Sequence, residues 1–513
     1  MILNRRTFLK ASATALTRQT LAQSIYSATL GKERPSCEAN AVVNDCHSKL
    51  NSTQVKNLNK IRNKSQAQEI IALARQANNT VTICGGRHAM GGQQFAQDAF
   101  LIDTNQFNKV IEFDQAAGII EVEGGMQWPE LVAYLDKSRW AIRQKPTGAD
   151  RISIAGCLSS NAHGRGLRLK PFIDDVVSFL LINSAGEEII CSRSDNQELF
   201  SLAIGGYGLF GFIASVKLKL APKVMLERQV NLIDIDDFVE TCEQQSANGS
   251  IYGDLQCEID PNSPTFLTRG IFSCYRPTQK SVSNTHSQKA LSSKDWAELV
   301  LMAHTDKAKA FEKYSRHYLA TNGQIYASDS HQLSTYVDDY HQHIDKHAGA
   351  KCPGTEMITE IYVPRKDLGN FMRDVQKDFR TNGVNLIYTT IRLIEQDKES
   401  FLPWAKQNYA CIIFNLHIDH NTSSIEKTAC DFRRLIDLGI KYGGSYYLTY
   451  HRYATKEQVI RCYPQFRDFL ALKLKYDPQE LFQSNWYRHY KAMFGHTKKQ
   501  HRDSALLLKS HQI

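Results

Sequence analysis

Glycines gather in three short segments that each adjoin an expected strand. They are Gly85-Gly86-Arg87-His88-Ala89-Met90-Gly91-Gly92, residues 146–166, and Gly205-Gly206-Tyr207-Gly208-Leu209-Phe210-Gly211-Phe212. Glycine has no Cβ, so successive backbone N–H groups can converge on an anion. A diphosphate held by bare backbone suits such loops, although one glycine at a turn is ordinary. The spacing is not GxGxxG with an acid further on, which disfavours a nicotinamide-dinucleotide site.

Regular elements must hold these loops in place. Ser65 and Gln68 form a capping-box pattern, and apolar residues at helical spacing predict a helix from Ser65 to Asn78-Asn79. A β-branched strand at 80–84 leads into the first loop. Further elements are expected as strands at 99–103, 110–113 and 118–123, a helix at 128–136, a hairpin of 176–183 with 188–192, and a strand ending near 222.

The order of these segments resembles the vanillyl-alcohol-oxidase-type (PCMH-type) family of FAD-linked oxidoreductases, over about residues 50–222. Within that family the chain is most similar to the sugar-lactone and alditol oxidases, with the decaprenylphosphoryl-ribose oxidases second. The resemblance implies an α+β fold, in which a two-subdomain FAD-binding part is joined to an α/β cap with an antiparallel sheet.

The resemblance also implies FAD as the cofactor and a set of residues around it. His88 stands where that branch carries a histidine bonded to the flavin, although Ala89 replaces the usual serine; a contact without a bond is the alternative. Arg87 could supply positive charge beside it. His163 matches a segment that packs beside the flavin. The residues expected to bind FAD are Gly85, Gly86, Arg87, His88, Ala89, Met90, Gly91, Gly148, Ile152, Ser153, Gly156, Ser159, Ser160, His163, Gly164, Gly211, Phe212 and Ile213.

The distal half supplies three catalytic candidates by the same resemblance. Arg392 falls where relatives carry the arginine of a Glu-x-Arg pair, and Thr390 replaces the acid. His417 falls near a substrate-side histidine, and Tyr450 where relatives often carry a lysine. Taking a hydride from a carbinol carbon needs a proton acceptor and a cation beside the reduced flavin. His417 or a tyrosinate at Tyr450 could be the acceptor, and Arg392 the cation.

The length and the composition indicate a globular protein of several parts. The 513 residues are 42% apolar and 22% charged, enough for a sizeable core. The expected parts are a leader (1–32), a lead-in (33–64), an FAD-binding domain (65–222), a substrate or cap domain (223–450), a segment returning to the FAD site (451–495) and a basic tail (496–513).

Charge, cysteine and histidine patterns exclude several other classes of site. The net charge of +9 is dispersed, so no nucleic-acid groove is expected. As partners, the resemblance implies a small-molecule substrate and an electron acceptor, oxygen or another. The twelve cysteines include no CxxC pair and suit buried thiols better than disulfides. His341, His343 and His347 lack supporting ligands, so no metal site is expected there.

The first residues resemble a twin-arginine export signal. Arg5-Arg6 are followed by Phe8-Leu9-Lys10 and a short apolar run, which predicts export to the periplasm; the alternative is a basic leader on a cytoplasmic protein. No other stretch approaches the apolar length of a membrane span.

Two other functions stay open beside an FAD-linked oxidase or dehydrogenase acting on the CH–OH group of a sugar, lactone or polyol. A flavin-dependent C=C reductase of the sterol-reductase type would use the same FAD domain with NAD(P)H, and the altered distal residues keep it open. A binding protein that retains the fold without turnover is the other.

Overall fold

The computed structural model describes residues 36–280, 289–334 and 340–495. The chain divides into two units, Met1–Ser36 and Cys37–Ile513, and the second contains every described residue except Ser36. The paired arginines of the expected leader and the basic tail lie outside the described residues. In the described ranges, no helix has both the length and the apolar character to cross a bilayer.

The first sheet carries the first glycine loop. Its strands lie in the order β1-β4-β6-β5, and β4 and β5 both pair in parallel with β6. Helix α2 packs on β6 through Ala67, Ile70 and Ala74, at the predicted helical spacing. The bounds are β1 Ser36–Ala39, β4 Asn57–Lys60, α2 Lys64–Gln76, β5 Val81–Cys84 and β6 Phe100–Asp103.

Residues 36–64 differ from the expected irregular lead-in. They form β1, the short pair β2 (Val42–Val43) and β3 (Thr53–Gln54), and β4, which is an inner strand of the sheet. The polar sequence of β4 does not look like that of an inner strand. Its buried Asn59 can lie there because its side-chain amide donates a hydrogen bond to Leu101 O at 3.1 Å. The cap of α2 also differs: Asn63, not Ser65, accepts from the Gln66 N–H.

The second sheet is antiparallel and carries the other two glycine loops. Its order is β11-β10-β12-β8-β7, with β9 paired to the far end of β12. The predicted hairpin is confirmed as β10 and β11, joined by a turn with φ +87° at Gly186. The bounds are β7 Val110–Asp114, β8 Ile119–Glu123, α3 Trp128–Tyr134, β9 Trp140–Ile142, α4 Ile154–Ser160, β10 Val176–Ile182, β11 Glu188–Ser192, α5 Gln197–Ala203 and β12 Phe212–Pro222.

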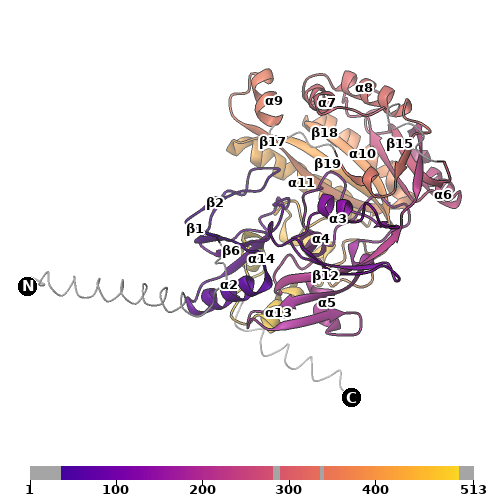
Figure 1. Ribbon diagram of the computed structural model, residues 1–513. Helices are drawn as coiled ribbons and strands as arrows, with labels where there is room; N and C mark the ends of the chain where they lie inside the picture. Colours follow the sequence, from indigo (N-terminus) through magenta and orange to yellow (C-terminus); the bar gives the residue numbers. More distant parts are fainter. Residues whose placement is uncertain (1–35, 281–288, 335–339, 496–513) are drawn as a thin grey trace, which may run out of the picture. The chain divides into compact units, whose positions relative to one another are not determined.

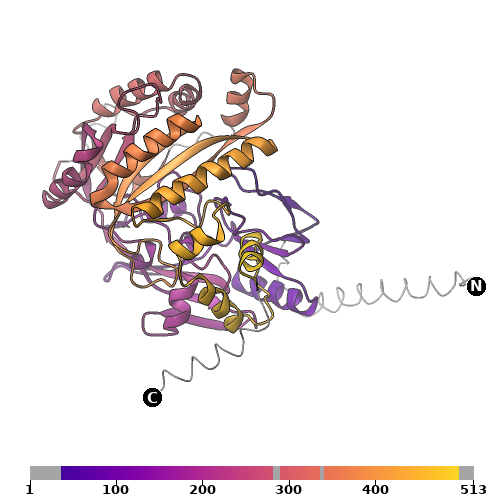
Figure 2. The same ribbon diagram turned by 180° about the vertical axis from the view of Figure 1, so that it is seen from behind.

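The third sheet follows β12 and has eight strands in the order β16-β13-β15-β14-β18-β19-β17-β20. All its pairings are antiparallel, so the predicted α+β class is confirmed. Helices α10 and α11 lie across one face, as Figure 2 shows from behind. The strands are β13 Met225–Asp234, β14 Tyr252–Cys257, β15 Arg269–Thr278, β16 Ile325–Ala327, β17 Gly354–Pro364, β18 Leu386–Ile394, β19 Tyr409–Asp419 and β20 Ser445–Tyr446.

Helices α7, α8 and α9 lie beside this sheet at the top of Figure 1. Helix α7 contacts β18 and α9, and α9 contacts β17. The helices of this part are α6 Phe238–Ala247, α7 Ser293–Thr305, α8 Lys307–Leu319, α9 Tyr340–Ala348, α10 Leu368–Asn382 and α11 Thr422–Lys441.

The last described segment returns to the first two sheets. Phe482 bridges Val81 of β5, and the Trp486 ring lies 4.8 Å from that of Tyr207 in the third glycine loop. Trp486 Nε1 also donates to Leu448 O at 3.2 Å. The helices of this segment are α12 Lys456–Cys462, α13 Phe466–Tyr476 and α14 Asn485–Phe494.

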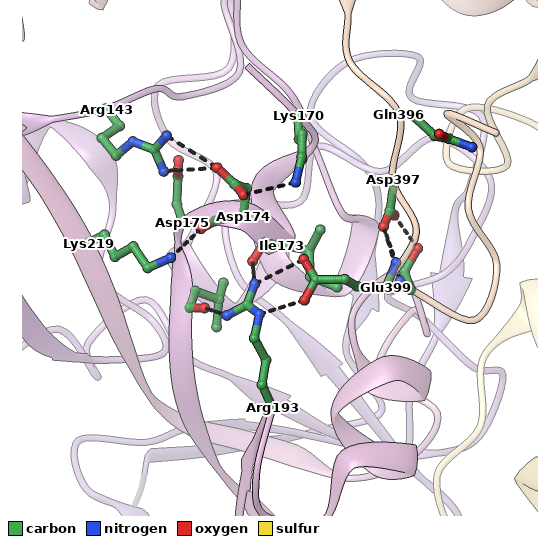
Figure 3. Close-up of polar contacts among 12 residues, drawn as sticks. Arg143, Lys170, Ile173, Asp174, Asp175, Arg193, Lys219, Gln396, Asp397 and Glu399 are labelled. Carbon is green, nitrogen blue, oxygen red and sulfur yellow. Dashed lines mark hydrogen bonds and ion pairs between the residues drawn. The ribbon is translucent and has the colours of Figure 1, made fainter. Parts of the chain in front are cut away.

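Charged side chains fix the short 3₁₀ helix at Phe172–Asp175, which follows the second glycine loop (Figure 3). Arg143 pairs with both Asp174 and Asp175, while Arg193 binds Glu399 and donates to Ile173 O at 3.0 Å. Through Glu399 the network ties this helix to the connection after β18.

The same 3₁₀ helix holds the backbone just before His163. Phe172 N–H donates to Ala162 O at 2.7 Å, and Ile173 N–H donates to Asn161 Oδ1 at 3.0 Å. Asn161 ends α4 in the left-handed region at φ 48°, which asparagine tolerates well. The network therefore sets where His163 lies.

Candidate functional site

A cavity of about 790 Å³ lies between the glycine loops and one face of the third sheet. Its volume suits a nucleotide cofactor and a small substrate. Most of the predicted residues line it: Gly85, Gly86, Arg87, His88, Ala89, Met90, Gly148, Ile152, Ser153, Gly156, Ser159, Ser160, His163, Gly211, Phe212, Ile213, Arg392 and Tyr450.

The first two glycine loops pack directly on one another. A Cβ at Gly86 would lie 1.8 Å from Arg151 O, and one at Gly85 would lie 2.2 Å from Ser153 Oγ. Neither position has room for a side chain. The loops predicted to bind one ligand jointly are therefore in contact, and their backbone forms a wall of the cavity, as a diphosphate site requires.

This contact predicts different effects for two glycine substitutions. Gly86→Ala must push the loops apart, so FAD affinity is expected to fall about 100-fold or more, a loss of about 2.7 kcal/mol. In Gly148→Ala the added Cβ meets no atom within 4 Å, so the only cost is backbone strain at a φ of +77°. That strain lowers the stability of the fold by about 1–2 kcal/mol. FAD titration of flavin-free protein, with the flavin content of purified protein beside it, measures both. Equal losses in the two variants would contradict the close contact.

Gly91 and Gly164 were expected to contact FAD, but neither lines the cavity. Gly91 N–H donates to Gln93 Oε1 at 3.0 Å, and Gly164 N–H donates to Gln144 Oε1 at 3.2 Å. A Cβ at Gly91 would lie 2.6 Å from the Gln93 side chain and one at Gly164 would lie 3.0 Å from Lys145 O, so both glycines allow close packing behind the cavity wall.

His88 lies in the cavity wall with a neutral ring. Burial lowers its pKa to about 3, and the positive charges of Arg151 and Lys145 add to this. Its Nδ1 is 3.7 Å from Cys46 Sγ. Arg87, whose φ is 60°, pairs with Asp103 at 2.8 Å, so the Asp103 carboxylate offsets part of its charge. His88 therefore has the neutral imidazole that attack on a flavin carbon requires.

Buried histidines predict how stability depends on pH. Burial lowers the pKa of His88 and of His451 to about 3, against about 6.5 in an unfolded chain. Below pH 6.5 the unfolded state binds more protons than the folded state. The free energy of unfolding therefore falls as pH falls from 6.5 towards 3, by about 1.4 kcal/mol per pH unit for each histidine. Denaturant unfolding of flavin-free protein at several pH values measures this slope.

His451→Phe should flatten the pH dependence of stability by one histidine's share, because phenylalanine binds no proton. The Phe432 ring, stacked on His451 at 4.5 Å, can pack on phenylalanine in the same way. His343→Ala, at an exposed position, is the control and should leave the slope unchanged. An unaltered slope in His451→Phe would remove this histidine from the account.

Facing the loops, three neighbouring strands present alternate residues to the cavity. Strand β19 lies between β17 and β18, and Ile413 of β19 is opposite both Glu360 of β17 and Thr390 of β18. In the next row, Cys411 is opposite both Tyr362 and Arg392. The residues of these strands that line the cavity are Ile358, Glu360, Ile387, Tyr388, Arg392, Ile413 and Asn415.

Glu360 is the acid of this face. It is 2% exposed, and its carboxylate accepts from Tyr450 at 2.9 Å and from Tyr362 at 2.7 Å, while His163 Nε2 lies 2.9 Å away. Burial raises the pKa of Glu360, but His163, Tyr362 and Arg392 together lower it below its ordinary value. Glu360 is therefore an ionised carboxylate in the cavity wall.

Sequence reasoning missed Glu360, because it looked for the acid at position 390, where this chain has a threonine. The register explains the exchange: Glu360 occupies the same row as Thr390, two strands away. Thr390 Oγ1 donates to Leu255 O at 3.1 Å instead. Only strand pairing could have found this, since the two residues are remote in sequence.

His163 is held between two acceptors. Its Nδ1 lies 3.0 Å from Gly164 O and its Nε2 lies 2.9 Å from Glu360 Oε2. Each ring nitrogen therefore faces an acceptor oxygen. His163 thus joins the second glycine loop to the face of the sheet that carries Glu360.

Two of the catalytic candidates need correction. His417 does not line the cavity; its Nε2 lies 3.3 Å from Asp419 and its ring packs against His304. Tyr450 does line the cavity, but burial and the nearby Glu360 raise its pKa well above the ordinary value. Tyr450 is therefore a phenol at neutral pH, not the tyrosinate expected from the sequence.

Arg392 lies in the cavity wall. It is 3% exposed and lines the cavity, and its Nε makes no hydrogen bond within the described residues. A guanidinium cannot lose its proton in a protein. The arginine thus brings a permanent positive charge to the face on which Glu360 lies.

The residues present fit FAD, since side-chain-free loops and an ionisable face enclose one cavity. Comparison with known proteins agrees. Residues 58–192 match the FAD binding domain family. L-gulonolactone oxidase of Mus musculus is 29% identical over 31% of this chain and 36% of its own length, and D-arabinono-1,4-lactone oxidase of Debaryomyces hansenii is 26% identical over 35% and 34%.

These two matches span about a third of each relative. L-gulono-1,4-lactone dehydrogenase of Mycobacterium tuberculosis is 21% identical over 83% of this chain and 94% of its own length. The chain therefore carries an FAD-binding domain of the PCMH type and is related to the sugar-lactone oxidases and dehydrogenases.

Proposed function

We propose that the chain is an FAD-dependent oxidoreductase that takes a hydride from a CH–OH group of a sugar lactone or a similar polyol. The observation that carries the proposal is the cavity, which has glycine loops on one side and Glu360, Tyr450 and Arg392 on the other. The relatives, by their names, act on lactones of this class. They support CH–OH oxidation over the C=C reductase alternative.

FAD, when bound, supplies the acceptor of the hydride. The chain must then accept the hydroxyl proton. Glu360 is ionised, lines the cavity and accepts a hydrogen bond from Tyr450 at 2.9 Å. The proton of the substrate hydroxyl thus goes to Glu360, with the Tyr450 phenol as a relay. Arg392 provides the fixed cation that favours negative charge arising in the cavity.

A panel of substrates tests the proposal. L-gulono-1,4-lactone, D-arabinono-1,4-lactone, xylitol and NADPH are supplied in turn, with oxygen uptake and dye reduction as readouts. Turnover of a lactone or polyol, with none from NADPH, supports the proposal. Flavin reduction by NADPH alone would favour the reductase, and a protein that binds no FAD would favour the binding protein. The same assay decides between oxygen and another acceptor.

We also propose that His88 is bonded to the flavin. Its neutral ring, with a pKa of about 3, and its place in the first glycine loop support this. After acid precipitation, the flavin should stay with the pelleted protein and release a His88 flavin-peptide on digestion. His88→Ala should move the flavin to the supernatant. A colourless pellet from the parent protein would mean that FAD is held without a bond.

Export by the twin-arginine route remains a proposal that rests on Arg5, Arg6 and the residues after them. Fusing residues 1–40 to a fluorescent reporter in a bacterial host tests it. Periplasmic fluorescence that disappears when Arg5 and Arg6 become lysine, or when the translocase is deleted, is the expected result. Cytoplasmic fluorescence from the unaltered fusion would place the protein in the cytoplasm.

A further inference from the structure

A second group of ionisable residues lies on the same face of the third sheet, beyond the rows that face the cavity. Glu356 of β17 is directly opposite His417 of β19, and the register places this pair beyond Ile358 and Asn415, which line the cavity. Glu356 is 0% exposed. A buried carboxylate needs partners of opposite charge or a metal ion.

The third member comes from helix α7. His304 lies in its last turn, and its Nε2 is 2.9 Å from Glu356 Oε1. The two atoms lie within ion-pair distance, and neither makes a hydrogen bond to any other described residue. His417 Nδ1 is also buried without a hydrogen-bond partner there. One ligand atom from each of His304, Glu356 and His417 lies within 4.8 Å of the other two.

Further residues hold these three in position. Tyr340 donates to Glu356 Oε2, and His341 Nδ1 lies 3.3 Å from the same oxygen, which leaves Oε1 to face His304. His417 Nε2 lies 3.3 Å from Asp419 Oδ1. Metal-bound histidines commonly use their second nitrogen in this way, because a carboxylate there fixes the ring and its tautomer.

We propose that His304, Glu356 and His417 bind a divalent transition-metal ion, with zinc the best match. Two imidazoles and one carboxylate form a donor set that zinc uses in proteins, and three protein ligands leave a fourth position for water or for His341. The alternative is a metal-free network of protonated histidines around Glu356. That network would leave His417 Nδ1 buried without a hydrogen-bond partner among the described residues, whereas a metal ion would use it.

The site would brace one wall of the cavity. Trp296, Leu299, Val300 and Ala303 of helix α7 line the cavity, and His304 follows them directly. Helix α9, at the top of Figure 1, contacts both β17 and α7. A metal held between α7, β17 and β19 would fix the helix against the sheet, at a place distinct from the two rows that contain Glu360 and Arg392.

Zinc titration of the flavin-containing full-length protein tests the site. The protein is treated with a chelator, titrated with Zn²⁺ by calorimetry, and analysed for metal after desalting. We expect one zinc per chain and a higher thermal unfolding midpoint with zinc than without. Glu356→Gln and His417→Gln should each weaken zinc binding about 100-fold or more, and so should His304→Ala. Circular dichroism and flavin absorbance check that each variant is folded.

The exposed pair His343 and His347 provides the matched control. Their rings lie 4.1 Å apart on α9, where two histidines one turn apart could bind zinc by themselves. The double variant His343→Ala/His347→Ala should bind zinc like the parent protein. Absence of stoichiometric binding in the parent, or loss of binding only in the double variant, would overturn the proposal. If His304→Ala does not fold, the two glutamine variants decide.

Discussion

The Glu360→Gln variant is expected to bind FAD like the parent protein but to be reduced by substrate about a thousandfold more slowly. Glutamine keeps the size of the side chain but cannot take the hydroxyl proton. Tyr450→Phe, which removes only the relay, should slow reduction less, because Glu360 itself lines the cavity. Anaerobic stopped-flow measurement of flavin bleaching gives both rates.

Glu395→Gln is the matched control for that prediction. Glu395 follows β18, a strand of the sheet that also carries Glu360. It pairs with Arg365 at 2.8 Å but does not line the cavity. Its loss should leave the reduction rate unchanged. If Glu360→Gln also reduced its flavin at the parent rate, the carboxylate would have no part in proton transfer, and another group would have to be the base.

Arg392→Met is expected to retain FAD and to slow reduction about 100-fold to 1,000-fold. Methionine fills much of the same space but removes the positive charge from the cavity wall. Negative charge that arises on reduction is then less stable, so the two-electron potential should fall by about 30 mV for each tenfold loss of stabilisation. Stopped-flow reduction and a spectroscopic potential titration measure the two effects.

Arg392→Lys keeps the charge and should recover part of both losses. Arg365→Met removes an arginine of the same domain that lies outside the cavity lining, and it should change neither quantity. Unchanged reduction kinetics in Arg392→Met would take the arginine out of the mechanism. A slower rate with an unchanged potential would limit Arg392 to binding the substrate.

Local sequence patterns predicted the FAD-binding half well. The helix before β5, the hairpin of β10 and β11, and the strand ending at Pro222 depend on neighbouring residues, so spacing and turn residues suffice to find them. Strand β4 was missed because it is polar and takes its place through pairing with β6. Propensity carries little information about such a strand.

The catalytic face could be predicted only in part. Arg392 lies within a recognisable motif, whereas Glu360 comes close to it in the cavity wall because β17 and β18 flank β19 in one register. His417 was assigned to the substrate side on its position in the chain. The structure places it beyond the cavity, with His304 and Glu356, which are remote from it in sequence. Sequence spacing cannot reveal groups that only long-range strand pairing brings together.

Anaerobic titration of the purified protein with a sugar lactone tests the central claim most directly. The claim is that one FAD occupies the cavity between the glycine loops and the face of Glu360 and Arg392, where a CH–OH group can reach it. The account predicts one flavin per chain, bleached stoichiometrically by the lactone. A flavin-free protein that takes up no FAD, or a bound flavin that no lactone or polyol bleaches, would contradict it.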